Sequence, residues 1–157
     1  MPRIIDADGH VVEPRTLWQD YVEPEFRDRV IQIRRGADGK DEFWVNAERR
    51  RAPGDSIVAA VIPGGCLDPE RTRTASWEDI LPGSWDPHER VKVLDAEGID
   101  ASFLYPSFYL LYGDLEDPRL AVAACCAYNN WMADFCRPYP RRLYGVARCR
   151  FRILMRP

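Results

Sequence analysis

Two Asp-Pro dipeptides each open a helix-like stretch that leads directly into a stretch of strand character. At the first of them, Asp86 is a good N-cap, Pro87 suits the first helical position, and Gly98 can adopt the left-handed conformation that ends a helix. These signals predict a helix over residues 87–97. The next residues, 99–106, are apolar and aromatic up to a proline, which predicts a buried strand.

The same order recurs further along the chain. Asp117 and Pro118 begin a stretch whose apolar residues fall at helical spacing until two prolines stop it, and residues 142–149 follow as a strand. Residues 3–11 form an apolar strand near the N-terminus. Strand, excursion, helix, strand, helix, strand is the alternation expected of an α/β protein with a parallel sheet.

The segment between the first strand and the first helix, residues 29–86, departs from this alternation. Residues 30–35 alternate apolar and polar side chains before a Gly-Ala-Asp-Gly turn, and residues 41–50 predict the returning strand of a hairpin. Residues 52–87 are rich in Pro, Gly and Arg and show little periodicity, which predicts a long, mostly irregular loop. Loops of that length are usually functional or disordered.

Composition and charge exclude several functional classes. The chain has 157 residues, 46% of them hydrophobic, which suits one packed domain. Its net charge of −3 means that it has no excess of positive charge with which to bind a polyanion. No run approaches the roughly 18 apolar residues that span a bilayer, and no secretory signal precedes the first strand, so we expect a cytoplasmic protein with neither membrane nor nucleic-acid partners. The five cysteines lack Cys-x-x-Cys spacing and are expected to be buried, reduced thiols.

The first strand ends in Asp-Ala-Asp-Gly-His, a concentration of ionisable groups where a buried strand should be apolar. Because side chains alternate along a strand, Asp6, Asp8 and His10 are expected to share one face, where carboxylate and imidazole can reach one divalent ion. Ligands bind at this carboxyl end of strands in parallel α/β folds, and Gly9 would let a ligand or another backbone approach closely. In the alternative interpretation, the two acids cap the following turn and His10 is an ordinary polar loop residue.

Longer strings in the sequence resemble those of a known family. IDADGHVVEP, followed by LWQDYVEPEFRDRV, resembles the opening of the amidohydrolase-related family called amidohydrolase 2, which includes the aminocarboxymuconate semialdehyde decarboxylase-like proteins. The resemblance continues in the family's order through DPHERVKVLDAEGIDASFLYPS, AYNNWMADFC and YPRRLYGVA, and covers about residues 3–147. It implies a (β/α)8 TIM barrel with one divalent metal ion, zinc foremost or manganese, that promotes hydrolysis or nonoxidative decarboxylation of a small carboxylated or cyclic substrate.

The resemblance also implies roles for particular residues. The family's first strand carries a His-x-His or acidic-x-His pair of metal ligands, and Asp8 and His10 stand at those positions. Tyr105 and Ser107, which follow the second barrel strand, would face the substrate, although Tyr-Pro-Ser is equally a common strand exit. Glu13 is interpreted as structural, since relatives share Glu-Pro mainly as the start of a loop. No catalytic residue is assigned.

The family draws further metal ligands from later strands, and this sequence does not contain them. Eight strands with their helices need about 200 to 250 residues, whereas residues 1–147 supply about three strands, an inserted β-hairpin and a long loop, followed by a divergent basic tail over residues 148–157. The other histidine, His88, falls in the first turn of a predicted helix, where a solvent-facing role is expected.

Two hypotheses of different class therefore remain. The first is a metal-dependent hydrolase or decarboxylase, truncated to the beginning of the barrel. The second is a catalytically inactive barrel fragment or interaction module that retains only the first metal half-site. Three parallel strands would leave unpaired edges, which favours a homodimer through an exposed sheet edge.

Overall fold

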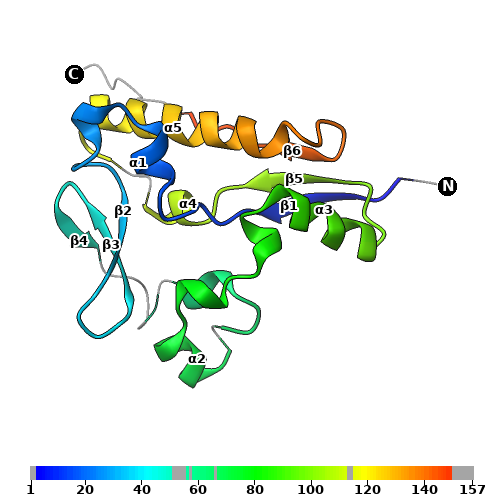
Figure 1. Cartoon of the computed structure of the whole chain (residues 1–157), viewed down its shortest axis with the longest axis horizontal. Coiled ribbons are helices and arrows are strands. Elements are labelled where there is room, and N and C mark those ends of the chain that lie inside the picture. The colour runs from blue at the N-terminus through cyan, green and yellow to red at the C-terminus, as the bar shows by residue number, and fades with distance from the viewer. Residues whose placement is uncertain (1–2, 51–55, 57, 66, 113–114, 150–157) are drawn as a thin grey trace, which may run out of the picture.

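A parallel sheet of three strands lies at the centre of the computed structural model, which describes residues 3–50, 56, 58–65, 67–112 and 115–149 (Figure 1). The strands are β1 (Ile5–His10), β5 (Ala101–Tyr105) and β6 (Leu143–Gly145), in the order β1-β5-β6 with both pairs parallel. Sheet order thus follows chain order, as in part of a (β/α)8 barrel. The fold class predicted from the sequence is confirmed. β6 is shorter than the strand predicted over residues 142–149.

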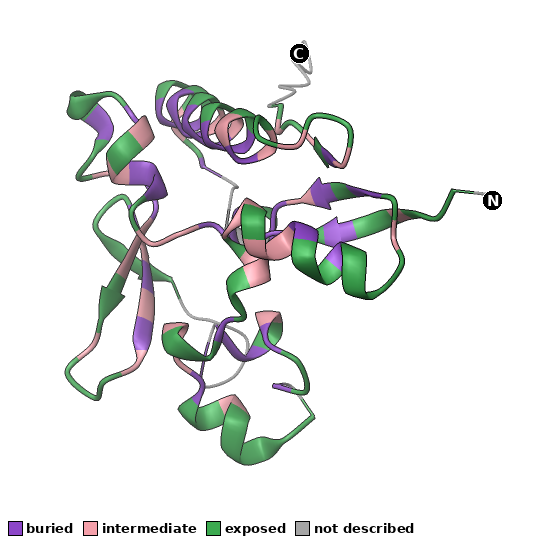
Figure 2. Ribbon diagram, turned by 45° about the vertical axis from the view of Figure 1, so that its right-hand side comes forward, coloured by how far each residue is buried: buried purple, intermediate pink, exposed green. Residues whose placement is uncertain are grey.

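The two long helices begin at the predicted residues. In α3 (Pro87–Ala96) and α5 (Pro118–Cys136), the carboxylates of Asp86 and Asp117 each accept hydrogen bonds from two backbone amides of the first turn. Gly98 has φ +69°, the left-handed conformation expected after α3. One side of α5 is buried along its length and faces the interior, while the opposite side is exposed (Figure 2). We refer to β1, β5 and β6 together with α3 and α5 as the frame.

Two short helices outside residues 29–86 were not predicted. They are α1 (Leu17–Tyr21) and α4 (Phe108–Tyr112), and the single turn η1 (Pro24–Phe26) follows the first of them. A helix of five residues is too short to show the apolar periodicity from which longer helices are recognised. α4 begins directly after the carboxyl end of β5 and therefore lies close to the end of β1 that carries His10.

A second, antiparallel sheet occupies the first part of residues 29–86, the segment that we call the excursion. Its strands are β2 (Gln32–Arg35), β3 (Asp41–Val45) and β4 (Glu48–Arg50), in that order. The predicted hairpin is confirmed, but the prediction of one returning strand over residues 41–50 is wrong. Asn46 and Ala47 have φ of 53° and 62° and turn the chain back between β3 and β4.

The remainder of the excursion consists of short helical turns. These are η2 (Val58–Val61), α2 (Pro69–Thr74), η3 (Trp77–Asp79) and η4 (Pro82–Ser84). Its end is joined to the frame just after β1, because the Val12 amide donates to the Ser84 carbonyl at 2.8 Å. The excursion therefore lies beside the carboxyl end of β1.

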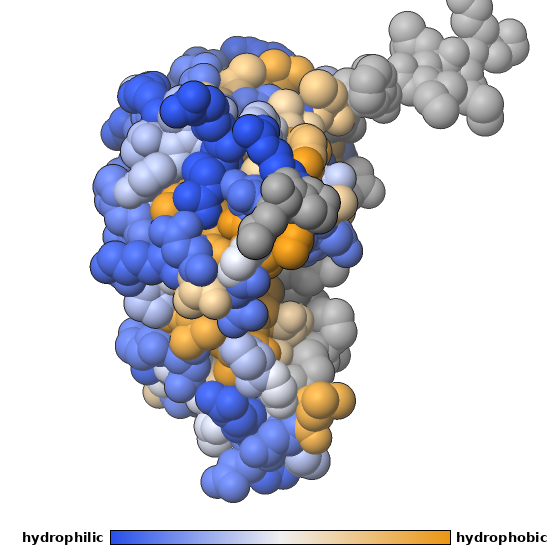
Figure 3. All heavy atoms as spheres, turned by 90° about the vertical axis from the view of Figure 1, so that its right-hand side faces the viewer, coloured by the Kyte–Doolittle hydropathy of each residue, from blue (hydrophilic) through white to orange (hydrophobic). Residues whose placement is uncertain are grey.

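The side chains on the two faces of the parallel sheet differ in how far they are exposed to solvent. Leu104 and Leu143 are buried among the core residues. Ile5, Phe103 and Tyr144, in contrast, are 53%, 41% and 41% exposed, and the rings of the last two stack with centroids 5.3 Å apart. Apolar residues among polar ones are visible on the surface of the molecule viewed from the side at which β1 begins (Figure 3).

The predicted burial of the cysteines is wrong for the four that the structure describes. Cys126 and Cys149 are exposed, and Cys125 and Cys136 are half-buried, while Cys66 lies outside the described residues. Three of the four lie on α5, which turns only one of its sides to the core. In the part of the chain that the structure describes, no helix has both the length and the apolar character needed to cross a bilayer.

Part of the predicted basic tail is described and packs on the frame. Asn129 exchanges two hydrogen bonds with the backbone of Arg148, at 2.8 and 2.9 Å, and the Arg148 guanidinium lies 4.9 Å from the centre of the Tyr109 ring. Residues 150–157 lie outside the described residues.

Candidate metal centre

β1 carries a bulge shortly before its carboxyl end. Asp6 is paired with Ser102 and Gly9 with Leu104, so three steps along β1 match two along β5. A Cβ atom at Gly9 would lie 2.3 Å from Ser102 Oγ and 2.5 Å from Asp6 Oδ2, which places Gly9 on the same side of the strand as Asp6. The prediction that Asp6, Asp8 and His10 share one face is therefore wrong for Asp6, because it assumed unbroken alternation.

Both carboxylate oxygens of Asp6 accept hydrogen bonds from within the protein. Its Oδ2 accepts a hydrogen bond of 2.6 Å from the Ser102 hydroxyl, and its Oδ1 accepts one of 3.1 Å from the Asp8 amide. The close approach expected at Gly9 is made by Ser102 and by the carbonyl of Phe103. Asp6 and Gly9 thus bound the bulge, and Asp8 within it and His10 after it take their positions from it.

Asp8 and His10 lie together at the end of β1. Asp8 Oδ1 is 3.8 Å from His10 Nε2, and the two side chains are 91% and 42% exposed. The other ring nitrogen, Nδ1, lies 3.0 Å from the Pro106 carbonyl oxygen. A carbonyl can only accept, so Nδ1 is the donor in this hydrogen bond, and Nε2 is the ring nitrogen that faces Asp8. A second hydrogen bond of this kind is typical of metal-binding histidines.

The pair fits part of a metal site. Two ligand atoms of a tetrahedral zinc ion, each about 2.0–2.1 Å from the metal, are about 3.4 Å apart. The separation of 3.8 Å between Asp8 Oδ1 and His10 Nε2 is close to that value, and the exposed aspartate has room to adjust. Among the described residues, no group of three or more His, Cys, Asp or Glu side chains could hold a metal ion. The structure therefore brings together the two predicted ligands without a third.

His10 opens onto a pocket of about 550 Å³, a size that suits a small molecule. Its described polar lining comes from His10, Ser84 and Ser107. Much of its apolar wall comes from the excursion, which contributes Ala60, Val61, Ile62, Pro63 and Leu81. The sequence predicts a long loop over residues 52–87, of a length that is usually functional or disordered, but it holds no signal for these wall residues, which come near His10 only in the tertiary structure.

The two residues predicted to face the substrate differ in their positions. Ser107 is buried and lines the pocket beside His10. Tyr105 is absent from the described lining, and its ring lies 5.9 Å from the His10 ring at a tilt of 35°. Ser107 is therefore placed to contact a ligand directly, whereas Tyr105 borders the imidazole. Substrate binding by either residue stays a prediction.

Arg90, on α3, contacts the backbone of the candidate ligand and was missed by sequence reasoning. Its guanidinium donates a hydrogen bond to the carbonyl of His10. Burial lowers the pKa of Arg90, while the negative charge of Asp6 opposes that shift. In the sequence Arg90 is one of many arginines of the chain, and nothing distinguishes it until the fold brings α3 beside β1.

Glu13 is fully buried behind the pocket. Its two carboxylate oxygens accept hydrogen bonds of 2.9 Å from the amides of Phe108 and Tyr109, the first residues of α4. Burial raises the pKa of Glu13, and hydrogen bonds from the Tyr109 and Phe108 amides counteract part of the rise. These contacts agree with the structural interpretation of Glu13.

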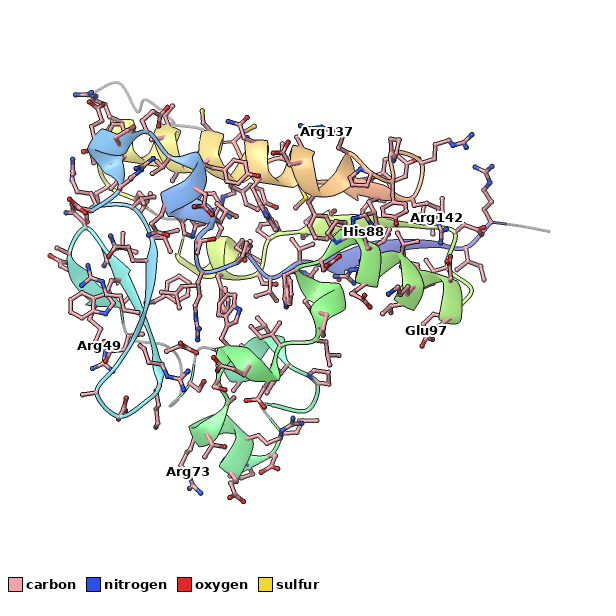
Figure 4. All side chains as sticks on the ribbon, in the orientation of Figure 1. Arg49, Arg73, His88, Glu97, Arg137 and Arg142 are labelled. Carbon is pink, nitrogen blue, oxygen red and sulfur yellow. The ribbon has the colours of Figure 1, made fainter. Side chains whose placement is uncertain are left out.

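His88 lies on α3 (Figure 4) and is not among the described residues that line the pocket. It is exposed, its amide is capped by Asp86, and its Nδ1 lies 2.9 Å from the Tyr139 hydroxyl. The solvent-facing role predicted for this histidine agrees with its exposure.

Comparison with known proteins supports the fold. No family model matches the chain, and no curated protein matches its sequence. An amidohydrolase from Mycobacterium avium subsp. paratuberculosis K-10 is similar in structure, with a TM-score of 0.66 and 20% sequence identity over 92% of this chain and 42% of that one. A 2,6-dihydroxybenzoate decarboxylase from Rhizobium aligns with a TM-score of 0.41 and 17% identity over 94% of this chain and 30% of that one.

This chain therefore spans less than half the length of either protein. The likeness to this amidohydrolase is one of fold: the described elements align with part of its chain, in agreement with the fold that the resemblance in the sequence implies.

Proposed function

We propose that this chain carries the first half of the metal site of a metal-dependent hydrolase or nonoxidative decarboxylase. The observation that supports the proposal most is the geometry at the end of β1. Asp8 Oδ1 and His10 Nε2 are 3.8 Å apart, and the Pro106 carbonyl holds the ring so that Nε2 is free to coordinate. A divalent ion bound there, zinc foremost or manganese, would activate water or polarise a substrate carboxylate.

The pocket beside the pair supports a small-molecule substrate. Its volume of about 550 Å³ suits a small carboxylated or cyclic compound, and its described lining is apolar except at His10, Ser84 and Ser107. In this proposal, Ser107 donates a hydrogen bond to the polar end of the substrate, and Tyr105 packs beside the His10 ring. The apolar wall from the excursion excludes water from the remainder of the substrate.

Metal content tests the proposal directly. The purified chain is equilibrated with zinc or manganese, freed of loosely bound ions and measured by elemental analysis, beside Asp8→Ala and His10→Ala. We expect stoichiometric metal in the parent chain and loss of most of it in both variants. His88→Ala is the matched control, because it removes the other histidine and should keep the metal. Equal, negligible metal in the parent chain and the two site variants would refute the half-site.

A second candidate function, an interaction module, is favoured by a different observation. Ile5, Phe103 and Tyr144 place large apolar side chains on an exposed part of the three strands, and β1 and β6 are edge strands of the described sheet. The partner in this second proposal is another copy of the chain. Sedimentation would then show a dimer that Phe103→Glu dissociates, whereas a monomer at all concentrations would exclude self-association.

A further inference from the structure

The loop that follows β5 touches the candidate site at consecutive residues. The Pro106 carbonyl accepts the hydrogen bond from His10 Nδ1, and the neighbouring Ser107 lines the pocket. The next two residues, Phe108 and Tyr109, donate their amides to the carboxylate of Glu13. The same four residues therefore orient the imidazole, form part of the pocket wall and bind one buried acid.

Glu13 is an unusual group to find in this place. It is 0% exposed and takes part in no ion pair within the described residues. An unpaired carboxylate is among the costliest groups to bury, and a short polar residue such as Ser or Asn at the surface would cap a five-residue helix without that cost. Stabilisation of α4 alone therefore does not account for a fully buried glutamate.

The surroundings of the loop keep it from moving independently of Glu13. The Tyr109 ring packs edge-on against Trp18, with centroids 4.8 Å apart, and at a tilt against Tyr128, with centroids 5.5 Å apart. Phe108 packs against Phe43 at 5.2 Å and Trp77 at 5.5 Å, both from the excursion. With the two rings enclosed in this way, the two hydrogen bonds to Glu13 fix the backbone at the start of α4, and thus the preceding carbonyl that faces His10.

We propose that Glu13 is a positioning residue of the site: by binding the Phe108 and Tyr109 amides it sets the Pro106 carbonyl against His10 Nδ1 and so keeps Nε2 as the free, metal-facing nitrogen. This inference deepens the proposed metal half-site and rests on it for its functional meaning. The predicted tautomer of His10, however, can be measured in the chain without any metal.

The test compares the parent chain with Glu13→Gln by nitrogen NMR of the His10 ring, without metal and at a pH above the ordinary pKa of histidine. Glutamine keeps the size of the side chain but replaces one accepting oxygen with an amide group, so that one of the two hydrogen bonds is lost. We expect the ratio of Nδ1–H to Nε2–H tautomers to fall about five-fold, the population change that corresponds to one hydrogen bond of typical strength.

Two controls separate positioning from general damage. Glu25→Gln removes the charge of an exposed glutamate that pairs with Arg119 and should leave the tautomer ratio unchanged. Leu143→Ala weakens the core under α5 without touching the loop, and should lower stability while leaving the ratio unchanged. A folded Glu13→Gln variant with the parent ratio would overturn the proposal. If this variant does not fold, Glu13→Asp, which is too short to reach both amides, replaces it with the same expected result.

The outcome is distinguishable from failure of the metal half-site. A shifted ratio in the variant, combined with a parent chain that binds no metal, would support the role of Glu13 and refute the proposed function. An unchanged ratio in a variant of a metal-binding chain would refute the role of Glu13 and leave the half-site standing.

Discussion

The frame and the excursion are stabilised in different ways. In the frame, the long helix α5 buries apolar side chains along one side, among them Leu120, Tyr128 and Trp131. Many apolar contacts therefore stabilise the frame. The excursion consists of short strands and single turns, which add side chains such as Phe43, Val58 and Ile62 to the core, and buried polar groups also fix its position. One of them is Asp41, whose fully buried carboxylate accepts from the Arg15 guanidinium at 2.6 Å and from the Trp77 amide at 2.9 Å.

This difference has a consequence for the site. The frame supplies Asp8 and His10 and the loop after β5 supplies Ser107, while the excursion supplies much of the apolar wall of the same pocket. Asp8 and His10 are thus held beside the part with the longest packed helix, and the apolar wall of the pocket is formed by short elements of the excursion. We expect changes in the excursion to alter the pocket while the frame remains folded.

The largest expected effect is on the frame. Leu104 is fully buried in the middle strand, and Leu104→Ala should lower the free energy of unfolding by about 3 kcal/mol, from lost apolar burial and the cavity left behind. Its neighbour Phe103 is 41% exposed, so Phe103→Ala is the matched control and should cost about 1 kcal/mol. Denaturant unfolding measures both. Equal losses would mean that the two faces of the sheet are equally covered.

An intermediate effect is expected in the excursion. Asp41→Ala removes the ion pair with Arg15 and leaves the Trp77 amide without its partner, which should cost about 2 kcal/mol. Amide hydrogen exchange should show faster exchange in the excursion and unchanged protection in α5. Glu48→Ala, at an exposed position of β4, should change neither region. Faster exchange in α5 as well would show that the two regions unfold together.

The smallest effect concerns the pH dependence of the excursion. The backbone amide of Glu78 itself, then Ser76 and Arg35, lower the pKa of the Glu78 carboxyl to about 2. A lowered pKa in the folded state means that the charged form stabilises the fold above the ordinary pKa of 4.5 and that this contribution is lost as the pH falls towards 2. Since the side chain is 64% exposed, the loss should be about 0.5 kcal/mol.

An NMR titration of the Glu78 carboxyl checks this value, and Arg35→Ala should raise the measured pKa. A midpoint near 4.5 in the parent chain would show that the contacts of Glu78 do not persist in solution.

Local signals accounted for much of the frame. The Asp-Pro caps at the starts of α3 and α5 and the glycine after α3 act within one or two turns of backbone, so they could be identified in the sequence. The Asp8-x-His10 spacing is likewise a local pattern that could be identified in the sequence. The fourth strand, β4, could not be identified, because Asn46 and Ala47 are not the usual glycine-containing pair of a tight turn.

The sequence by itself determined the order of α3, α5 and the strands of the parallel sheet and the close spacing of an acid and an imidazole at the end of β1, since both depend on residues near one another in the chain. Only the tertiary structure decided that a bulge separates Asp6 from that pair and that Pro106 orients the ring of His10. It also decided that the excursion forms the wall of the pocket. These features depend on contacts between distant segments, and such contacts follow from packing of the whole chain, for which no local pattern exists.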